Sequence, residues 1–316
     1  MRVNSQLPNS QASNDRRRLG VGSWELGVRA IPMRVPFLLC VWVACAAIAA
    51  AQAPTRSGAA APKQSEGGRF RVCEDPSNMP FSNDKLEGFE NRIAELIAKD
   101  FGATPSYIWW GQRRGFIRNT MNATLEEGRC DIVIGVPKEY DLVRTTKPYY
   151  RSTYVFVYPK AKGWTIASLD DPRLKKLKIG VHLLGDDYTN PPPVHELSKR
   201  GVVDNVVGFN TFYSDTNPPS AIIDAVASGR IDVAIVWGPL AGYYAKRQGV
   251  PMALVPVPSG KGDLPFAFDI SMGVKKGNDA LYAKVEQVLD KRKPEIMKIL
   301  MDYGVPVVDI KAGSPR

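Results

Sequence analysis

The sequence predicts an α/β protein built from two lobes with a cleft between them. From residue 70 to residue 135, short apolar runs alternate with helical patterns, and this alternation is typical of a parallel sheet. The alternation begins again after the polar segment 159–163, which indicates a second lobe of the same architecture. An extended run at 266–274 is expected to pair back with the first lobe, so that the chain crosses between the lobes twice.

In the first lobe, β-branched and aromatic runs predict strands at 70–73, 106–110 and 131–135. Apolar residues at helical spacing predict a first helix through Phe89, Ile93, Leu96 and Ile97. Gly102 ends this helix, and a second helix is expected over 115–125. The long run 149–158 is then expected to form a strand that crosses into the second lobe.

The second lobe is expected to contain strands at 178–181, 206–209 and 232–236, with helices near 192–200, 219–229 and 239–248. A short extended run at 252–255 precedes the returning strand. The last part of the chain is helical, and Pro294 divides it because proline lacks the amide hydrogen that a helix interior requires. The second of these two helices ends at Gly304.

Composition excludes several classes of protein. The 316 residues are 44% hydrophobic, which suffices for real cores and excludes a disordered or collagen-like chain. The formal net charge is +10, but residues 1–53 contain six arginines and only two acids. Without them, 36 basic and 30 acidic residues remain, a charge of +6 that favours an acidic partner.

The N-terminal segment predicts export to the periplasm. Arg34 is followed by an uncharged, mostly apolar run at 35–53 that ends in small residues with the A-x-A pattern of a cleaved signal peptide. An uncleaved membrane anchor and a lipoprotein modified at Cys45 are the alternatives, but no basic stop follows the run. The expected domains are an upstream extension with the signal peptide at 1–53, a flexible linker at 54–69, a first lobe at 70–158 plus 251–316, and a second lobe at 159–250.

Cleavage of the signal peptide would leave Cys73 and Cys130 as the only cysteines. An even pair in an oxidising compartment favours a disulfide, with two buried free thiols as the alternative. The two residues are expected on the first and third strands, which are neighbours in the usual 2-1-3 order of such a sheet. We therefore predict that they are bonded to each other.

Candidate binding residues lie at the predicted strand ends, because ligands of such sheets bind beyond the carboxyl ends of the strands. Arg113, Arg114 and the 78–81 loop are the strongest, since a loop with proline and asparagine has little reason to be buried. Trp237 is better explained as a core residue. The candidate set for ligand or partner binding is Asp75, Asn78, Met79, Phe81, Trp110, Gln112, Arg113, Arg114, Pro137, Asp186, Asp187 and Trp237.

No catalytic residue, metal or cofactor is expected. The sequence lacks the phosphate-binding loop, the dinucleotide-binding glycines, the nucleophile elbow and the paired-histidine zinc motif. It has only two histidines, His182 and His195, which excludes multi-histidine metal chemistry. The acidic pairs at 170–171 and 186–187 are better explained as helix caps or solvated turns than as a calcium site.

Six segments together resemble the MxaJ/XoxJ type of periplasmic binding-protein-like accessory proteins of methanol (quinoprotein) dehydrogenases. The resemblance extends from Phe70 to about Tyr303 and is carried by FRVCEDPSNMPFSN, EGFENRIAELIAKD, WWGQRRGFIRNT, EEGRCDIVIGVP, KPYYRSTYVFVYP and GRIDVAIVWGPLAGYYA. It implies a type II periplasmic binding protein fold. It also implies a role beside a PQQ-dependent alcohol dehydrogenase.

The amino-acid-binding members of the wider group supply a further comparison. There, an arginine nine residues before the proline of the Pro-Tyr-Tyr element commonly holds the ligand carboxylate, and this chain has Glu139 at that position. The acid that often holds the ligand ammonium group falls at Trp237 and its neighbours. Arg144 cannot be assumed to replace the missing arginine. An ordinary amino acid is therefore not the expected ligand.

These observations lead to two hypotheses of different kinds. The first is a non-catalytic periplasmic accessory protein that binds the quinoprotein dehydrogenase subunit and aids its maturation or activation. The alternative is the solute-binding protein of an ABC transporter for a small non-amino-acid ligand. The fold does not decide between them, because one cleft can hold either a small molecule or a peptide segment. An enzyme ranks third, and neither nucleic-acid binding nor stable membrane insertion after signal cleavage is expected.

Overall fold

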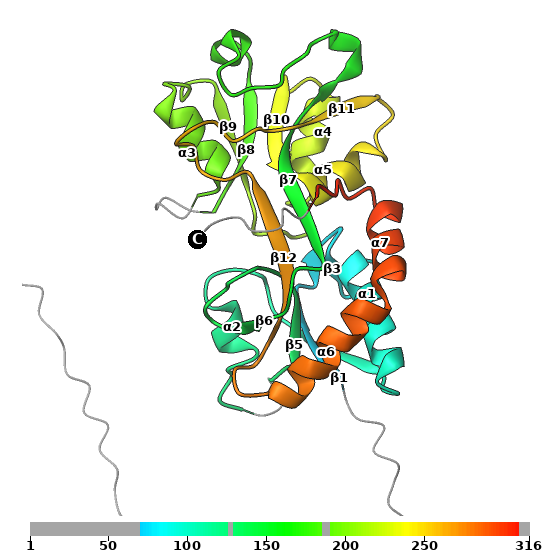
Figure 1. Cartoon of the computed structure of the whole chain (residues 1–316). Coiled ribbons are helices and arrows are strands. Elements are labelled where there is room, and N and C mark those ends of the chain that lie inside the picture. The colour runs from blue at the N-terminus through cyan, green and yellow to red at the C-terminus, as the bar shows by residue number, and fades with distance from the viewer. Residues whose placement is uncertain (1–69, 126–128, 185–189, 310–316) are drawn as a thin grey trace, which may run out of the picture. The chain divides into compact units, whose positions relative to one another are not determined.

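The computed structural model describes residues 70–125, 129–184 and 190–309. The predicted extension, signal peptide and linker therefore lie outside the described residues, as do Asp186 and Asp187. One ten-stranded sheet runs through both lobes in the order β4-β1-β5-β12-β7-β10-β8-β9, with β11 paired to β7 and β6 paired to β12 (Figure 1). Within the described part of the chain, no helix combines the length and apolarity needed to cross a membrane.

The first lobe has the predicted strand order. Strand β1 lies between β4 and β5 and is parallel to both, which is the 2-1-3 arrangement. Helix α1 buries Phe89, Ile93 and Ile97 completely, and each such side chain contributes about 1.5–3 kcal/mol of burial free energy. The elements are β1 (Phe70–Glu74), β2 (Ser77–Asn78), β3 (Ser82–Asn83), α1 (Phe89–Asp100), β4 (Pro105–Trp109), α2 (Phe116–Asn119), β5 (Ile132–Pro137) and β6 (Arg144–Thr145).

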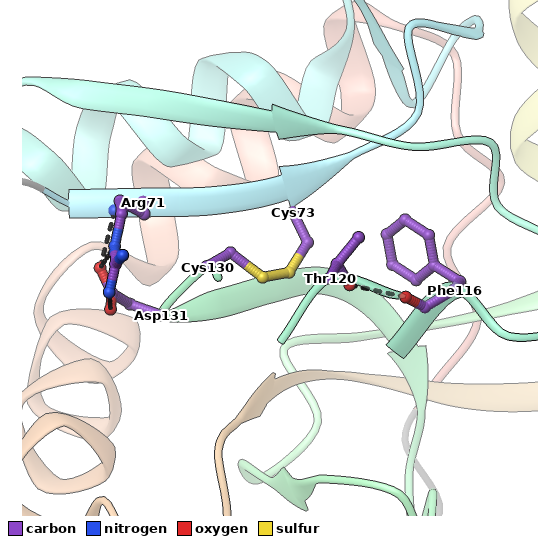
Figure 2. Close-up of a disulfide and its surroundings, with 6 residues drawn as sticks. All are labelled: Arg71, Cys73, Phe116, Thr120, Cys130 and Asp131. Atoms are coloured by element: carbon purple, nitrogen blue, oxygen red, sulfur yellow. Dashed lines mark hydrogen bonds and ion pairs between the residues drawn. A yellow bond between two sulfur atoms is a disulfide. The ribbon is translucent and has the colours of Figure 1, made fainter. Parts of the chain in front are cut away.

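Cys73 and Cys130 are bonded to each other, with 5.4 Å between their Cα atoms (Figure 2). Cys73 lies in β1 and Cys130 lies two residues before β5, so the bond ties neighbouring strands as the predicted sheet order requires. Both residues are buried in a small core with Phe116, Ile117 and Met121.

The helix expected over 115–125 is wrong in length, because α2 is a single turn. Thr120 leaves the helical conformation, and its hydroxyl donates to the carbonyl of Phe116 at 2.7 Å (Figure 2). Hydroxyl and amide side chains that bond to nearby backbone favour turns over helix interiors. The turn allows Met121 to pack in the same core as Phe116.

The second lobe repeats the architecture. Strands β8, β9 and β10 are parallel to one another, while β7 and β11 are antiparallel additions at one side. The main elements are β7 (Tyr150–Pro159), β8 (Ile179–Leu183), α3 (Pro192–Lys199), β9 (Val206–Asn210), α4 (Ala221–Ala227), β10 (Val233–Trp237), α5 (Gly238–Ala245) and β11 (Met252–Pro256). Two short 3₁₀ helices, η2 (Lys160–Lys162) and η3 (Pro172–Lys175), lie between β7 and β8.

The chain returns to the first lobe along β12 (Ala267–Val274), as expected. This strand is antiparallel to β5 and to the first half of β7, so β7 and β12 form the two connections between the lobes (Figure 1). The terminal helices α6 (Asp279–Lys291) and α7 (Lys293–Asp302) share the apolar core of α1.

The expected lobe boundaries at 158 and 251 need correction. β7 changes partners within its own length, pairing with β12 up to Thr153 and with β10 from Tyr154 onward. β11 pairs with β7 alongside the second lobe, and Phe266 belongs to the second lobe's core. The return crossing therefore lies at the start of β12 rather than before residue 251, because the strand partner of β11 among the described residues is the second-lobe half of β7.

Candidate functional site

The main hollow of the candidate site lies between the lobes and has a volume of about 1200 Å³. Its first-lobe wall comes from 112–117, after β4, and from 135–137, Tyr140 and Leu142, at and after the end of β5. Its second-lobe wall consists of Leu184, Thr211 and Phe212. All of these segments lie at or beyond the carboxyl ends of parallel strands, where ligands of such sheets bind. We call this hollow the groove.

A smaller pocket of about 150 Å³ adjoins the groove and shares Gln112, Arg113, Thr211 and Phe212 with it. The pocket is completed by the loop after β1, including Asp75, and by Tyr213. The predicted residues that line the groove or the pocket are Asp75, Gln112, Arg113, Arg114 and Pro137.

Asp75 holds the two first-lobe loops together. One of its carboxylate oxygens accepts from the Ser77 amide at 2.9 Å, and the other accepts from the Gln112 amide at 2.6 Å. The side chain of Asn78 also donates to the Gln112 side chain at 2.9 Å. Asp75 and Asn78 therefore position the arginine-bearing loop after β4.

The two predicted arginines are exposed, and one of them contacts the opposite lobe. The guanidinium carbon of Arg113 lies 5.3 Å from the centre of the Phe212 ring, within cation–π range. Arg114 lines the groove on its first-lobe side. The structure thus places both arginines at the mouth of the hollow that sequence analysis predicts.

Besides Asn78, four predicted residues of the described chain lie outside the groove and the pocket. The Phe81 side chain is half-buried and contacts the cores of both lobes, and its ring centre lies 5.2 Å from that of Phe89. The expectation that the 78–81 loop is exposed is therefore wrong for this residue. Met79 is also half-buried, and its carbonyl accepts from the Tyr244 hydroxyl at 3.5 Å. Trp237 packs against Tyr154 and Phe268 in the core, and Trp110 is 44% exposed but lines neither hollow.

The second-lobe wall formed by 211–213 was not predicted from the sequence, although it directly follows β9. The strand-end rule that identifies the loops after β1, β4 and β5 applies equally to β9 and would have found Phe212 and Tyr213. Leu142 and Tyr140 were also missed, because they lie beyond Pro137 in a stretch with no motif.

Two buried glutamates lie beneath the first-lobe loops. Glu74 is the last residue of β1 and Glu90 lies in the first turn of α1, and their exposed fractions are 3% and 2%. Burial raises the pKa of Glu74 to about 8. Burial also raises the pKa of Glu90, and the neighbouring Glu74 raises it further. The Glu90 carboxyl occupies the space where a side chain at Gly135 would project, so Glu90 lies directly behind a groove-lining residue.

The histidines and acids do not form a metal centre within the described residues, where no group of three His, Cys, Asp or Glu side chains could hold an ion. His182 is buried in β8, and burial lowers its pKa to about 4. Its ring centre lies 6.3 Å from that of Tyr213. His182 is therefore a neutral packing residue at physiological pH.

The first prediction is that free α-amino acids bind negligibly. Glu139 is exposed, and the Arg144 guanidinium pairs with Asp279 and lies 3.7 Å from the Tyr282 ring centre on α6, away from the groove. A carboxylate in the cleft would thus lack the arginine that amino-acid-binding relatives supply. Thermal-shift screening of the common amino acids should show no saturable stabilisation, and micromolar binding of any of them by calorimetry would contradict the prediction.

Comparison with known proteins supports the sequence resemblance. Residues 70–304 match the family described as bacterial extracellular solute-binding proteins, family 3. The protein MoxJ of Methylorubrum extorquens is 32% identical over 279 residues, which cover 84% of this chain and 90% of MoxJ.

Two solved structures agree with this assignment. The periplasmic binding protein XoxJ from Methylobacterium extorquens AM1 has 37% sequence identity and a TM-score of 0.62, with coverage of 76% of this chain and 100% of XoxJ. MxaJ from Methlophaga aminisulfidivorans MPT has 28% identity and a TM-score of 0.64, with coverage of 76% and 100%. These comparisons confirm both the predicted type II periplasmic binding protein fold and the resemblance to the MxaJ/XoxJ type.

Proposed function

The chain belongs to the bacterial extracellular solute-binding proteins, family 3, and we propose that it is a non-catalytic accessory protein of a PQQ-dependent methanol or alcohol dehydrogenase. In this role it works in the periplasm, binds the dehydrogenase subunit and aids its maturation or activation. The similarity to MoxJ, XoxJ and MxaJ supports a methanol dehydrogenase system, because XoxJ and MxaJ are the proteins after which the resembled accessory group is named.

One observation carries the proposal: the cleft is built for something other than a free amino acid. The groove volume of about 1200 Å³ exceeds the 300–1,000 Å³ typical of small-molecule sites. Glu139 stands at the position of the usual carboxylate anchor, and Trp237 stands near that of the usual ammonium anchor. A large hollow without these anchors fits a protein segment better than an amino acid.

The solute-binding alternative rests on the smaller pocket. Its volume of about 150 Å³ and its lining of Asp75, Ser77, Arg113 and Tyr213 suit a small polar molecule. A transporter component would bind such a solute without any affinity for a dehydrogenase.

The second prediction separates the two functions. We expect the mature protein to bind purified dehydrogenase subunit, in its apo form, with a dissociation constant of about 10 µM or tighter by calorimetry. Deletion of the gene should lower dehydrogenase activity in periplasmic extracts, and a plasmid copy should restore it. Absence of binding together with unchanged activity after deletion would reject the accessory role, and loss of uptake of one solute in that strain would favour the transporter.

A further inference from the structure

Three arginines beside the groove differ from most of the other arginines that the structure describes. Within the described residues, arginines with a carboxylate oxygen within 4.0 Å are Arg71, Arg92, Arg144, Arg151, Arg173, Arg200 and Arg292. Arg113, Arg114 and Arg118 are exposed, and no described carboxylate lies within that distance of them. Their positive charge is therefore not neutralised by ion pairs among the residues that the structure describes.

The three arginines flank one another at the first-lobe rim. Arg113 and Arg114 line the groove, and the Arg118 guanidinium folds back toward Gly115, which also lines it. None of the described residues that line the groove is an aspartate, a glutamate or a lysine. The described lining of the groove is thus positive, with Asp75 in the adjoining pocket as the nearby acid, and a positive lining favours a negatively charged occupant.

The surface beside these arginines is apolar. Leu142, Leu184 and Phe212 are exposed by 55%, 44% and 48% and come from three different loops, yet all three line the groove. Phe116 and Ile117 are buried and also contribute apolar surface to the groove lining. Large apolar side chains that converge from two lobes mark an interaction site rather than scattered surface residues.

We propose that the groove receives an extended acidic peptide segment of the partner, with carboxylates on Arg113, Arg114 and Arg118 and aromatic or aliphatic side chains on Leu142, Leu184 and Phe212. The inference rests on the proposed function and names the part of the partner that the groove recognises. The Arg113 guanidinium, which covers the Phe212 ring at 5.3 Å, turns toward the incoming carboxylate and exposes the ring for an apolar side chain. The positive charge of the arginines attracts the acidic segment to the rim, and apolar contacts in the groove stabilise the complex.

The test uses three synthetic ten-residue peptides and the mature protein. The first alternates glutamate with leucine and phenylalanine, the second replaces glutamate with lysine, and the third replaces the apolar residues with serine. We expect the first peptide alone to bind, with affinity that falls as sodium chloride rises from 50 to 500 mM. Equal binding of the lysine peptide or of the serine peptide would overturn the inference.

Variants locate the site. Replacing Arg113, Arg114 and Arg118 together with alanine should weaken binding of the first peptide and of the dehydrogenase subunit by about 30-fold or more, as for other interface hot spots. The control replaces Lys175, Lys176 and Lys178, which are exposed on the second lobe and line neither the groove nor the pocket, and so removes the same charge. Both variants should keep the unfolding midpoint of the original protein.

The outcomes distinguish the two proposals. If the subunit binds the arginine variant as tightly as the original protein, the groove assignment fails while the accessory function stands. If the acidic apolar peptide binds and the subunit does not, the groove assignment stands and the accessory function fails. If the lysine control loses as much affinity as the arginine variant, only total charge matters and the inference is overturned.

Discussion

Removal of the Cys73–Cys130 disulfide is expected to lower the free energy of unfolding by about 4 kcal/mol in the chain-entropy model. The bond joins residues separated by 57 positions, so the unfolded chain gains much conformational freedom when it is absent. Both sulfurs are buried, and alanine is the appropriate replacement because a serine hydroxyl would be buried there as well. Urea unfolding of the Cys73→Ala, Cys130→Ala variant at neutral pH measures the loss.

A second route to the same state provides the control. The original protein with a reducing agent should approach the stability of the alanine variant, and the agent should leave that variant unchanged. A loss below about 1 kcal/mol would show that the unfolded chain retains structure that keeps the two cysteines close. Phe116 and Ile117 pack in the same small core, so the variant should also loosen the first-lobe wall of the groove.

The fold was predictable because strand and helix periods alternate clearly in this sequence. The return of β12 to the first lobe and the neighbouring positions of Cys73 and Cys130 both follow from the usual order of strands in such a sheet. The lobe in which β11 pairs could not be predicted from this strand order. Its five residues pair with β7 through backbone hydrogen bonds, and nothing in their side chains indicates which lobe supplies the partner strand.

The site was predictable only in part, for a related reason. Strand ends can be located from sequence, so Asp75, Gln112 and Arg113 were found. Burial of a loop residue depends on what packs over it, and Phe81 lies between two cores that are distant in sequence. The same limit hid the buried Glu90, because its position in the first turn of α1 would suit an exposed helix-capping acid equally well.

That buried acid pair makes the stability of the protein depend on pH. Burial raises the pKa of Glu74 to about 8, so this carboxyl holds a proton in the folded protein near pH 6. Burial and the neighbouring Glu74 also raise the pKa of Glu90 well above its usual value. Tyr149 interacts with both carboxyls, Tyr107 with Glu74 and Tyr150 with Glu90. Burial raises the pKa values of all three tyrosines, so they stay neutral. In the unfolded chain the glutamates would release their protons near pH 4.5.

The sign of the effect follows from this difference. Between about pH 4.5 and pH 8 the folded protein binds more protons than the unfolded chain, so the contribution of Glu74 to stability is complete below pH 4.5 and is lost as the pH rises through about 8. Glu90 acts in the same direction, because burial raises its pKa as well. Each extra proton lowers the free energy of unfolding by up to about 1.4 kcal/mol per pH unit. Asp171 acts in the opposite direction at low pH, because hydrogen bonds from Arg173 lower its pKa.

We therefore expect the unfolding midpoint in urea to decrease steadily from pH 5 to pH 9. Replacing Glu74 and Glu90 together with glutamine, which resembles a protonated carboxyl but does not titrate, should flatten this dependence and make the variant the more stable protein at pH 9. Glu95→Gln is the matched control, because the Glu95 side chain is on the same helix α1 but is 42% exposed. If the unfolding midpoint of the double variant depended on pH as steeply as that of the original protein, the glutamate pair would not be the cause of the pH dependence. Since Glu90 lies behind Gly135, ionisation of the buried pair at high pH should also weaken binding of an acidic segment in the groove.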